Sequence, residues 1–551
     1  MSNASFQVAA ASAVSAIEAG YGLLHADTIV ATTNDELCLA PPGVLKINGR
    51  ETRGKLGELG LKPGVYDAEI NGRKARLILV EPGRTARKFG VRHGCLGYDA
   101  PVITGEHATA SWDTLWKTGA YPDIVVDFEA PYKFVFWRGM SYAPSWALGN
   151  CMTSFFFAET LEPGVFRDCC EMMSDRECRY SHARVIQASA ARIVVHWRCA
   201  LADTDYNICR NQWADELFYI YPDGTAVRNA TIHLDPGDEA VWQTCPRTLR
   251  RVPCSMIDRP PGKRAFNDME FITVNPPGAS SDAITPLEAL TLLDADEFAE
   301  TFRWPRPRSL AGAGLPKLRE YIFRMNYKNR AGVFVASRPE GLRVQLQENT
   351  GMRYKPGARV ADDRWETVKH LPVNFADHIH WPVTRGYGTA PLTDPAVCRD
   401  RPTHTFLGFA NNAPGEVTER GDVTWTWFCG MAPENEGDLR ARVRSWSRPA
   451  TIRGASYLAR EGAYRVDARG RESALEVESA EPVIRPAFLL PRMRLPGLVV
   501  LVNGQRADAG EVALGVEASL DSEQTVVTFR TDLSGGAVVQ FEQVESPANA
   551  K

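Results

Sequence analysis

Lysine is scarce in this sequence. Of 63 basic residues, 13 are Lys and 50 are Arg, and 67 acidic residues bring the formal net charge to −4. A chain without a basic excess is not expected to take nucleic acid as its main ligand, because phosphate binding leaves a basic footprint. No window approaches the roughly 20 uninterrupted apolar residues of a membrane helix, so we expect no membrane span. The arginine excess reflects either codon usage or guanidinium groups that bind carboxylates and sulfates through paired hydrogen bonds.

Several common catalytic motifs are also missing. The chain has no P-loop, no G-x-G-x-x-G that opens a helix, no G-x-S-x-G and no H-E-x-x-H, which excludes most nucleotide enzymes, common serine hydrolases and zincins. None of the twelve cysteines forms a C-x-x-C pair, so zinc ribbons and thioredoxin-like sites are not indicated. Eight of them lie between Cys151 and Cys254, either as disulfides of a secreted protein or as buried free thiols, and both alternatives stay open.

Short strand patterns dominate what is present. Asn71-Gly72 predicts a hairpin between Val65–Ile70 and Ala75–Val80, and Pro222-Asp223-Gly224 predicts another between Leu217–Tyr221 and Thr225–Leu234. Further strands are expected at Ile124–Phe128, Lys133–Trp137, His182–Gln187, Arg192–Cys199, Gly332–Ser337, Val423–Phe428, Leu475–Glu478, Gly497–Val502 and Thr525–Arg530. Helical patterns are few and cover Val8–Leu24, Pro286–Phe302 and Gly437–Trp446.

This pattern predicts a mainly β fold for a chain of 551 residues, long enough for two to four domains. We expect a large antiparallel β-sandwich, supersandwich-like, with smaller β domains on either side and few helices. The expected boundaries are 1–110 for an N-terminal β-rich domain, 111–440 for the central β-sandwich and 441–551 for a C-terminal β-sandwich.

The alternation of side chains along a strand predicts which polar residues share a face. Tyr180, His182 and Arg184 share one face of a strand, and Arg192, Val194, His196 and Arg198 share one face of the next. Tyr219 and Tyr221 share a face in a strand that is expected to begin with Asp215. Arg228 joins them after a two-residue loop but lies opposite after a bulged three-residue loop, and the sequence leaves both open.

Tyr, His and Arg on one β surface suit the cleavage of a uronic-acid polysaccharide by β-elimination. An Arg, His or Asn neutralises the carboxylate beside the acidic C5 proton, and Tyr or His side chains take that proton and protonate the departing O4. The catalytic candidates are therefore His182, His196, Arg198 and Tyr219. The candidates for substrate binding, where Trp and Tyr offer stacking surfaces, are Tyr142, Asn150, Arg184, Trp197, Tyr221 and Arg228. The same residues are also compatible with ordinary sheet packing.

Two other constellations have less definition. His378 and His380 are spaced like metal ligands and, with His404, can bind a structural zinc or calcium ion, although no cofactor is required by the expected reaction. Asp175, Glu177, Asp215 and Glu216 can supply the carboxylate pair of a glycoside hydrolase, but spacing identifies no pair.

A run of motifs between about residues 123 and 487 resembles a known family. The motifs are Arg138-Gly139-x-Ser141-Tyr142-x-Pro144-x-Trp146, Met173-Ser174-Asp175 to Cys178-Arg179-Tyr180-Ser181-His182, Val195-His196-Trp197-Arg198, Asp215-Glu216 to Tyr221-Pro222-Asp223-Gly224, and His380-Trp381-Pro382-Val383. As a set they resemble the ulvan-lyase-like polysaccharide lyases of bacterial glycan breakdown, family 40.

The resemblance implies a secreted or periplasmic lyase whose partner is an anionic polysaccharide or oligosaccharide. It points to His182, His196, Arg198 and either Tyr219 or Tyr221 as site residues. The sequence departs from the expected pattern at Cys199, at Leu217-Phe218 and over Ala147–Asn150, which puts the identity of the glycan and the acid/base tyrosine in doubt. A glycoside hydrolase on a related β scaffold and a carbohydrate-binding protein without catalysis remain the alternatives.

Overall fold

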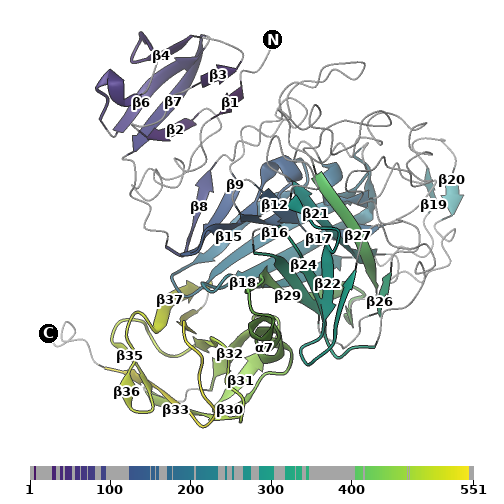
Figure 1. Cartoon of the computed structure of the whole chain (residues 1–551), viewed down its shortest axis with the longest axis vertical. Helices are drawn as coiled ribbons and strands as arrows, with labels where there is room; N and C mark the ends of the chain where they lie inside the picture. The colour runs from purple at the N-terminus through teal and green to yellow at the C-terminus, as the bar shows by residue number, and fades with distance from the viewer. Residues whose placement is uncertain are drawn as a thin grey trace.

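The fold is mainly β, as expected, and the computed structural model in Figure 1 defines it. The structure describes residues 5–7, 28–32, 38–40, 44–94 with short gaps, 123–160 with short gaps, 170–233 with short gaps, 242–244, 251–253, 265–274, 284–302, 317–337 with a short gap, 343–346 and 404–544 with short gaps. The expected helix over Val8–Leu24 lies outside these residues.

The N-terminal part of the chain forms a small five-stranded sheet. Its strands, in spatial order, are β2 (Thr28–Thr32), β7 (Arg73–Val80), β6 (Gly64–Ile70), β4 (Leu45–Ile47) and β5 (Arg50–Thr52). Ile70 lies opposite Arg73, so Asn71-Gly72 is the two-residue turn that the sequence predicted, and Gly72 has the positive φ of 81° that this turn needs. Leu45, Leu77 and Leu79 pack on one face of the sheet around Leu56.

The central part contains two antiparallel β layers. The first layer consists, in spatial order, of β8 (Gly90–Gly94), β9 (Asp123–Asp127), β10 (Tyr132–Phe136), β11 (Pro144–Leu148), β12 (Cys151–Ser154), β21 (Ala265–Val274), β27 (His404–Ala413) and β26 (Arg343–Leu346). Strand β8 therefore belongs to this layer, whereas the sequence assigned residues 90–94 to the N-terminal domain.

The second layer carries the strands on which the sequence analysis placed its catalytic candidates. Its spatial order is β15 (His182–Ala188), β16 (Ile193–Ala202), β17 (Ile208–Ile220), β18 (Thr225–His233), β29 (Val423–Met431), β25 (Val333–Ser337), β24 (Tyr321–Met325), β22 (Leu290–Leu293) and β23 (Ala299–Phe302). At one edge β13 (Phe157–Thr160) pairs with β21, and β14 (Cys170–Glu171) joins it to β16, which links the two layers.

The main hydrophobic core lies between these layers. Phe134 of the first layer approaches Phe218 of the second with ring centroids 5.7 Å apart, and Phe136 contacts the same ring at 5.2 Å. Six cysteines of the described residues are buried free thiols, which favours the free-thiol alternative for them: Cys151, Cys170, Cys178, Cys199, Cys209 and Cys429. This arrangement is the large antiparallel sandwich that the strand pattern predicted.

A helix covers part of the outer face of the second layer. Helix α7 (Glu436–Ser447) begins at Asn435, whose side chain accepts a hydrogen bond from the Gly437 N–H at 2.9 Å, and it confirms the helix expected at Gly437–Trp446. Its buried side chains pack on apolar residues of β18, β29 and β25. The expected boundary at residue 440 is wrong, because it cuts this helix. Within the described ranges, neither this 12-residue helix nor any other has the length and apolar character to cross a membrane.

The helix expected over Pro286–Phe302 is wrong, because this segment forms the hairpin of β22 and β23. Leu290 and Leu292 face the core between the layers, while Leu293 faces α7, so apolar side chains are buried on both faces of one strand. Burial on both faces imitates a helical pattern. The Asp294 carboxylate then accepts backbone hydrogen bonds from Asp296 and Phe298, at 2.8 and 2.9 Å, and turns the chain back.

The C-terminal part is a β-sandwich of two five-stranded sheets, as expected. One sheet has the order β30 (Thr451–Arg453), β33 (Glu472–Glu478), β39 (Val538–Gln543), β35 (Leu498–Val502) and β36 (Gln505–Arg506), and the other β31 (Ala455–Leu458), β32 (Ala463–Val466), β34 (Ala487–Leu490), β38 (Glu523–Phe529) and β37 (Val512–Ala518). Figure 1 shows it beside α7, at the C-terminal end of the chain.

Candidate functional site

The two faces of β16 differ as the alternation of side chains predicted. Ile193, Val195 and Trp197 are fully buried in the core between the layers. His196 and Arg198 lie on the outer face, where their side chains are 17% and 45% exposed. The outer face is therefore the one that can meet a ligand.

The register of the strands brings basic side chains together on this outer face. His182 of β15 lies opposite Arg198 of β16, and Arg184 lies opposite His196. Side chains directly opposite each other in an antiparallel pair have Cβ atoms roughly 4.5–5.5 Å apart. Two strands therefore present two histidines and two arginines as one patch, and both His182 and Arg184 are exposed.

Asp215 of β17 connects this patch. Its Oδ1 accepts a hydrogen bond from His196 Nε2 at 2.6 Å, and its Oδ2 accepts one from Arg198 Nη1. Burial alone would raise the pKa of the Asp215 carboxyl, but the hydrogen bond from His196 and the neighbouring cationic groups outweigh burial and hold the pKa below its usual value. The carboxyl is therefore ionised at neutral pH, and its charge partly balances the patch.

Two residues that the sequence analysis missed complete the group. His233 of β18 bonds to Asp215 Oδ2 through Nε2 at 2.9 Å and to Asp422 Oδ2 through Nδ1 at 3.2 Å. The signal was present in the sequence, because the Pro222-Asp223-Gly224 turn fixes the pairing that puts His233 opposite Trp213. On the same face this places His233 diagonally from Asp215. We name His182, Arg184, His196, Arg198, Asp215, His233 and Asp422 the Asp215 cluster.

Aromatic rings border the cluster on β17. The Arg198 guanidinium lies over the Trp213 ring at 5.0 Å, and the Tyr180 ring meets Trp213 edge-on at 6.2 Å. Beyond Tyr180, the Arg179 guanidinium lies over the Tyr206 ring at 4.3 Å. Arginines that stack on aromatic rings keep a fixed orientation while their N–H groups stay available to anions.

A buried carboxylate holds the segment that leads into β15. Asp175 accepts backbone hydrogen bonds from Arg179, Tyr180 and Ser181 at 2.8, 2.7 and 2.9 Å. Burial raises the pKa of the Asp175 carboxyl, although these hydrogen bonds act in the opposite direction. Asp175 therefore shapes the loop from inside and does not supply a surface carboxylate for a glycosidase, while Glu177 lies outside the described residues.

Three of the expected substrate-binding residues are buried away from the outer face, which corrects their assignment. Trp197 is fully buried and its Nε1–H donates to the Ser141 carbonyl at 3.1 Å, and Tyr142 is only 5% exposed. Arg228 is fully buried and makes two hydrogen bonds to Glu216, at 2.7 and 2.6 Å. The turn explains Arg228: Tyr221 pairs with Thr225 across a three-residue loop, which is the alternative that puts Arg228 on the inner face.

The two tyrosines lie at the junction with the C-terminal sandwich. Tyr219 is diagonal to His196 in the sheet, but its ring lies 5.0 Å from the Arg192 guanidinium, and burial raises its pKa to about 12. Tyr221 is buried, donates to the Glu461 carbonyl, and burial likewise raises its pKa. Tyr219 is thus a poor base at neutral pH, and Tyr221 does not face a ligand.

The metal candidates are only partly described. His378, His380 and also Asn150 lie outside the described residues, and His404 begins β27 opposite Val274. Among the residues that the structure does describe, no group of three His, Cys, Asp or Glu side chains is arranged to hold a metal ion.

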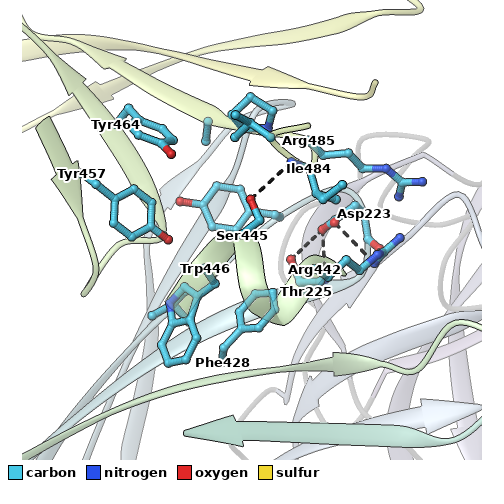
Figure 2. Close-up of a pocket in the computed structure, with 16 residues that line it drawn as sticks. Asp223, Thr225, Phe428, Arg442, Ser445, Trp446, Tyr457, Tyr464, Ile484 and Arg485 are labelled. Carbon is cyan, nitrogen blue, oxygen red and sulfur yellow. Dashed lines mark hydrogen bonds and ion pairs between the residues drawn. The ribbon is translucent and has the colours of Figure 1, made fainter. Parts of the chain in front are cut away.

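A cavity lies between α7, the β17–β18 turn and the C-terminal sandwich (Figure 2). Asp223, Arg442, Ser445, Tyr457 and Arg485 are among the residues that line it. Its volume is about 50 Å³. Because one water needs roughly 10–15 Å³ of such space, the cavity has room for a few waters and not for a sugar ring. The exposed Asp215 cluster remains the better candidate site.

Comparisons with known proteins give little. No protein-family model and no curated protein matches the chain. Among solved structures, a galactose 1-epimerase from Lactobacillus acidophilus is 7% identical with a TM-score of 0.25, over 63% of this chain and 99% of that one. An amine oxidase from Aspergillus nidulans is 8% identical with a TM-score of 0.18, over 68% of this chain and 50% of that one. Both scores are low, so the fold and the site rest on the chain's own residues.

Proposed function

We propose that the chain is a polysaccharide lyase that cleaves an anionic, uronic-acid-containing glycan at the Asp215 cluster. One observation carries the proposal: His182, Arg184, His196 and Arg198 form one exposed patch on two adjacent strands, and Asp215 orients His196 within it. The two guanidinium groups carry positive charge and paired N–H donors on an exposed face, which suits an anionic ligand such as a uronate carboxylate.

The roles follow from the chemistry of β-elimination. Arg184 and Arg198 bind the uronate carboxylate and stabilise the negative charge that develops when C5 loses its proton. His196 takes this proton, the C5–H electron pair forms the C4=C5 double bond, and the C4–O4 bond breaks. His182 gives a proton to the departing O4. Tyr219, whose pKa is raised to about 12, is then not needed as the base.

The shape of the site fits a polymer better than a small sugar. The residues lie on the outer face of β15, β16 and β17, partly or fully exposed, with Trp213 and Tyr180 beside them. An open face accepts a chain that continues on both sides of the cleaved bond. Secretion or export to the periplasm would bring the enzyme to such a polymer, and we include this localisation in the proposal.

Glycoside hydrolysis is less well supported by the same geometry. The two carboxylates of the cluster, Asp215 and Asp422, both bond to His233. An inverting hydrolase needs room for a water between its two carboxyl groups, and here an imidazole ring occupies the space between them. A lyase needs no such pair.

The test is a panel of ulvan, alginate, glucuronan, pectin and glycosaminoglycans, read by ultraviolet absorbance of unsaturated uronate and, in parallel, by new reducing ends. We expect at least one glycan to give both signals, and His196→Asn to lower the rate by about 10²–10⁴-fold. The matched control is Arg465→Gln, an exposed strand arginine of the C-terminal sandwich, which should leave the rate unchanged. Reducing ends without the chromophore would indicate a hydrolase, and binding without either signal would indicate a carbohydrate-binding protein.

A further inference from the structure

Four side chains of the Asp215 cluster form a continuous hydrogen-bonded row across four strands. The order is Asp422, His233, Asp215 and His196, joined by contacts of 3.2, 2.9 and 2.6 Å. They come from the residue before β29, from β18, from β17 and from β16, which are neighbours in the sheet (Figure 1). Neither the strand pattern nor the proposed roles in elimination account for the far half of this row.

The hydrogen positions in the row follow from its chemistry. An ionised carboxylate can only accept, and the lowered pKa of Asp215 keeps that carboxyl ionised at neutral pH. Its Oδ1 therefore receives the hydrogen on Nε2 of His196. A neutral imidazole carries one ring hydrogen, so Nδ1 of His196 keeps its lone pair and makes no hydrogen bond within the described part of the chain.

His233 differs from His196, because both of its ring nitrogens face carboxylates. Nε2 can donate to Asp215 Oδ2 and Nδ1 can donate to Asp422 Oδ2, because an ionised carboxylate only accepts. Asp215 Oδ2 is thus held by His233 and by Arg198, while Oδ1 is left to His196 alone. With Oδ2 held from two sides, the carboxylate cannot turn away from His196.

We propose that His233, clamped by Asp422, is a positioning residue that fixes Asp215 and thereby makes Nδ1 of His196 the atom that removes the substrate proton. The role of His196 in proton removal rests on the proposed function, whereas the fixing of Asp215 by His233 does not. Arg198 also holds Asp215, yet Arg198 is placed to bind substrate, so His233 is the residue whose replacement separates positioning from binding.

The first experiment needs no substrate. Histidine labelled with ¹⁵N in the full-length chain reports by NMR which ring nitrogens carry hydrogen, and His196→Asn and His233→Ala assign the two rings. In the wild type near pH 8 we expect hydrogen on Nε2 and none on Nδ1 of His196, and hydrogen on Nε2 of His233, the nitrogen that faces Asp215. In His233→Ala the His196 ring should become a mixture of both tautomers. His233→Gln, which restores one N–H donor towards Asp215, should bring back the single form.

A wild-type His196 with hydrogen on Nδ1, or a His233→Ala variant with an unchanged His196 signal, would overturn the proposal. If His233→Ala does not fold, Asp422→Ala provides the second variant. It removes the carboxylate that holds His233 in place, so the His196 ring should again become a mixture of both tautomers.

The second experiment uses a glycan that the wild type cleaves. His233→Ala should lower kcat about tenfold with KM within about twofold, and His233→Gln should recover most of kcat, because a positioning residue acts on the base and not on substrate binding. A rise in KM with unchanged kcat would contradict the positioning role. If no glycan is cleaved, the lyase proposal fails, while the NMR result still decides whether His233 fixes the row.

Discussion

Asp215 and Glu216 are neighbours in the sequence, yet they lie on opposite faces of β17 and form opposite kinds of ion pair. Glu216 is fully buried and holds Arg228 through two hydrogen bonds, inside the core between the layers. Asp215 is 22% exposed and shares its two oxygens among Arg198, His196 and His233. Each pair joins a carboxylate and an arginine, but the Glu216–Arg228 pair is shielded from solvent and the Asp215–Arg198 pair is accessible to a ligand.

The difference shows that the two faces of one strand place the same kind of ion pair in surroundings with different demands. On the inner face each polar atom must find a partner in the protein, because no water reaches it. On the outer face the single negative charge of Asp215 does not balance the positive charges of Arg184 and Arg198, and the remaining positive charge is available to an anion. Three changes test whether this difference is real.

The largest effect is expected from breaking the inner pair. Arg228→Ala leaves the Glu216 carboxylate buried without a partner and should lower the free energy of unfolding by about 3–5 kcal/mol, measured by urea denaturation. The double variant Glu216→Leu with Arg228→Met should recover most of this loss, since it removes both charges together. A single variant as stable as the wild type would mean that the inner pair is not closed to water.

A smaller effect, with a distinct pH dependence, is expected from the outer face. The pKa of the Asp215 carboxyl is lower in the folded chain than in the unfolded chain. At pH values above the unfolded-state pKa the ionised carboxylate therefore stabilises the fold, and this contribution is lost as the pH falls through the folded-state pKa. Asp215→Asn should therefore cost at most about 1 kcal/mol at neutral pH, because solvent screens these partly exposed charges. Denaturation at several pH values should show the stabilities of wild type and variant converging as the pH falls below the usual pKa of Asp, about 3.9. A gap that widens on acidification would contradict this assignment.

The smallest effect is expected where an arginine pair lies wholly at the surface. Arg453 in β30 is 68% exposed and bonds to Glu476 and Glu478 at 2.8 and 2.7 Å. Solvent screening leaves such pairs with little net worth, so Arg453→Gln should not measurably shift the unfolding midpoint. A clear destabilisation by Arg453→Gln would show that exposed ion pairs also contribute to stability. Exposure alone would then not explain a difference in stability between the Glu216 and Asp215 pairs of β17.

Sequence patterns predicted the fold well because its main signals are local. The Asn71-Gly72 turn, the hairpin that ends at His233, and the alternation along β16 all depend on residues a few positions apart. The segment Pro286–Phe302 was mistaken for a helix because its leucines are buried on both faces by partners distant in sequence.

The candidate site was predictable only in part, for the same reason. Alternation placed His182, Arg184, His196 and Arg198 on one face, and the structure brings them together. It could not show that Tyr221 is covered by the C-terminal sandwich, or that Asp422, 189 positions along the chain and just before β29, comes beside His233. Pairings between distant segments decide these two points.

The contact of Arg192 with the C-terminal sandwich has a consequence for dissecting the chain by truncation. Arg192, next to the start of β16, is almost fully buried and bonds to Glu517 of β37 at 2.5 and 2.6 Å and to Glu461 at 2.8 Å. Removal of residues 451–551 would strip this guanidinium of both carboxylates and uncover Tyr219 and Tyr221. The central sandwich and its C-terminal neighbour should therefore be produced as one piece, since a shortened chain would leave Arg192 without a carboxylate partner and would expose the apolar residues around Tyr221.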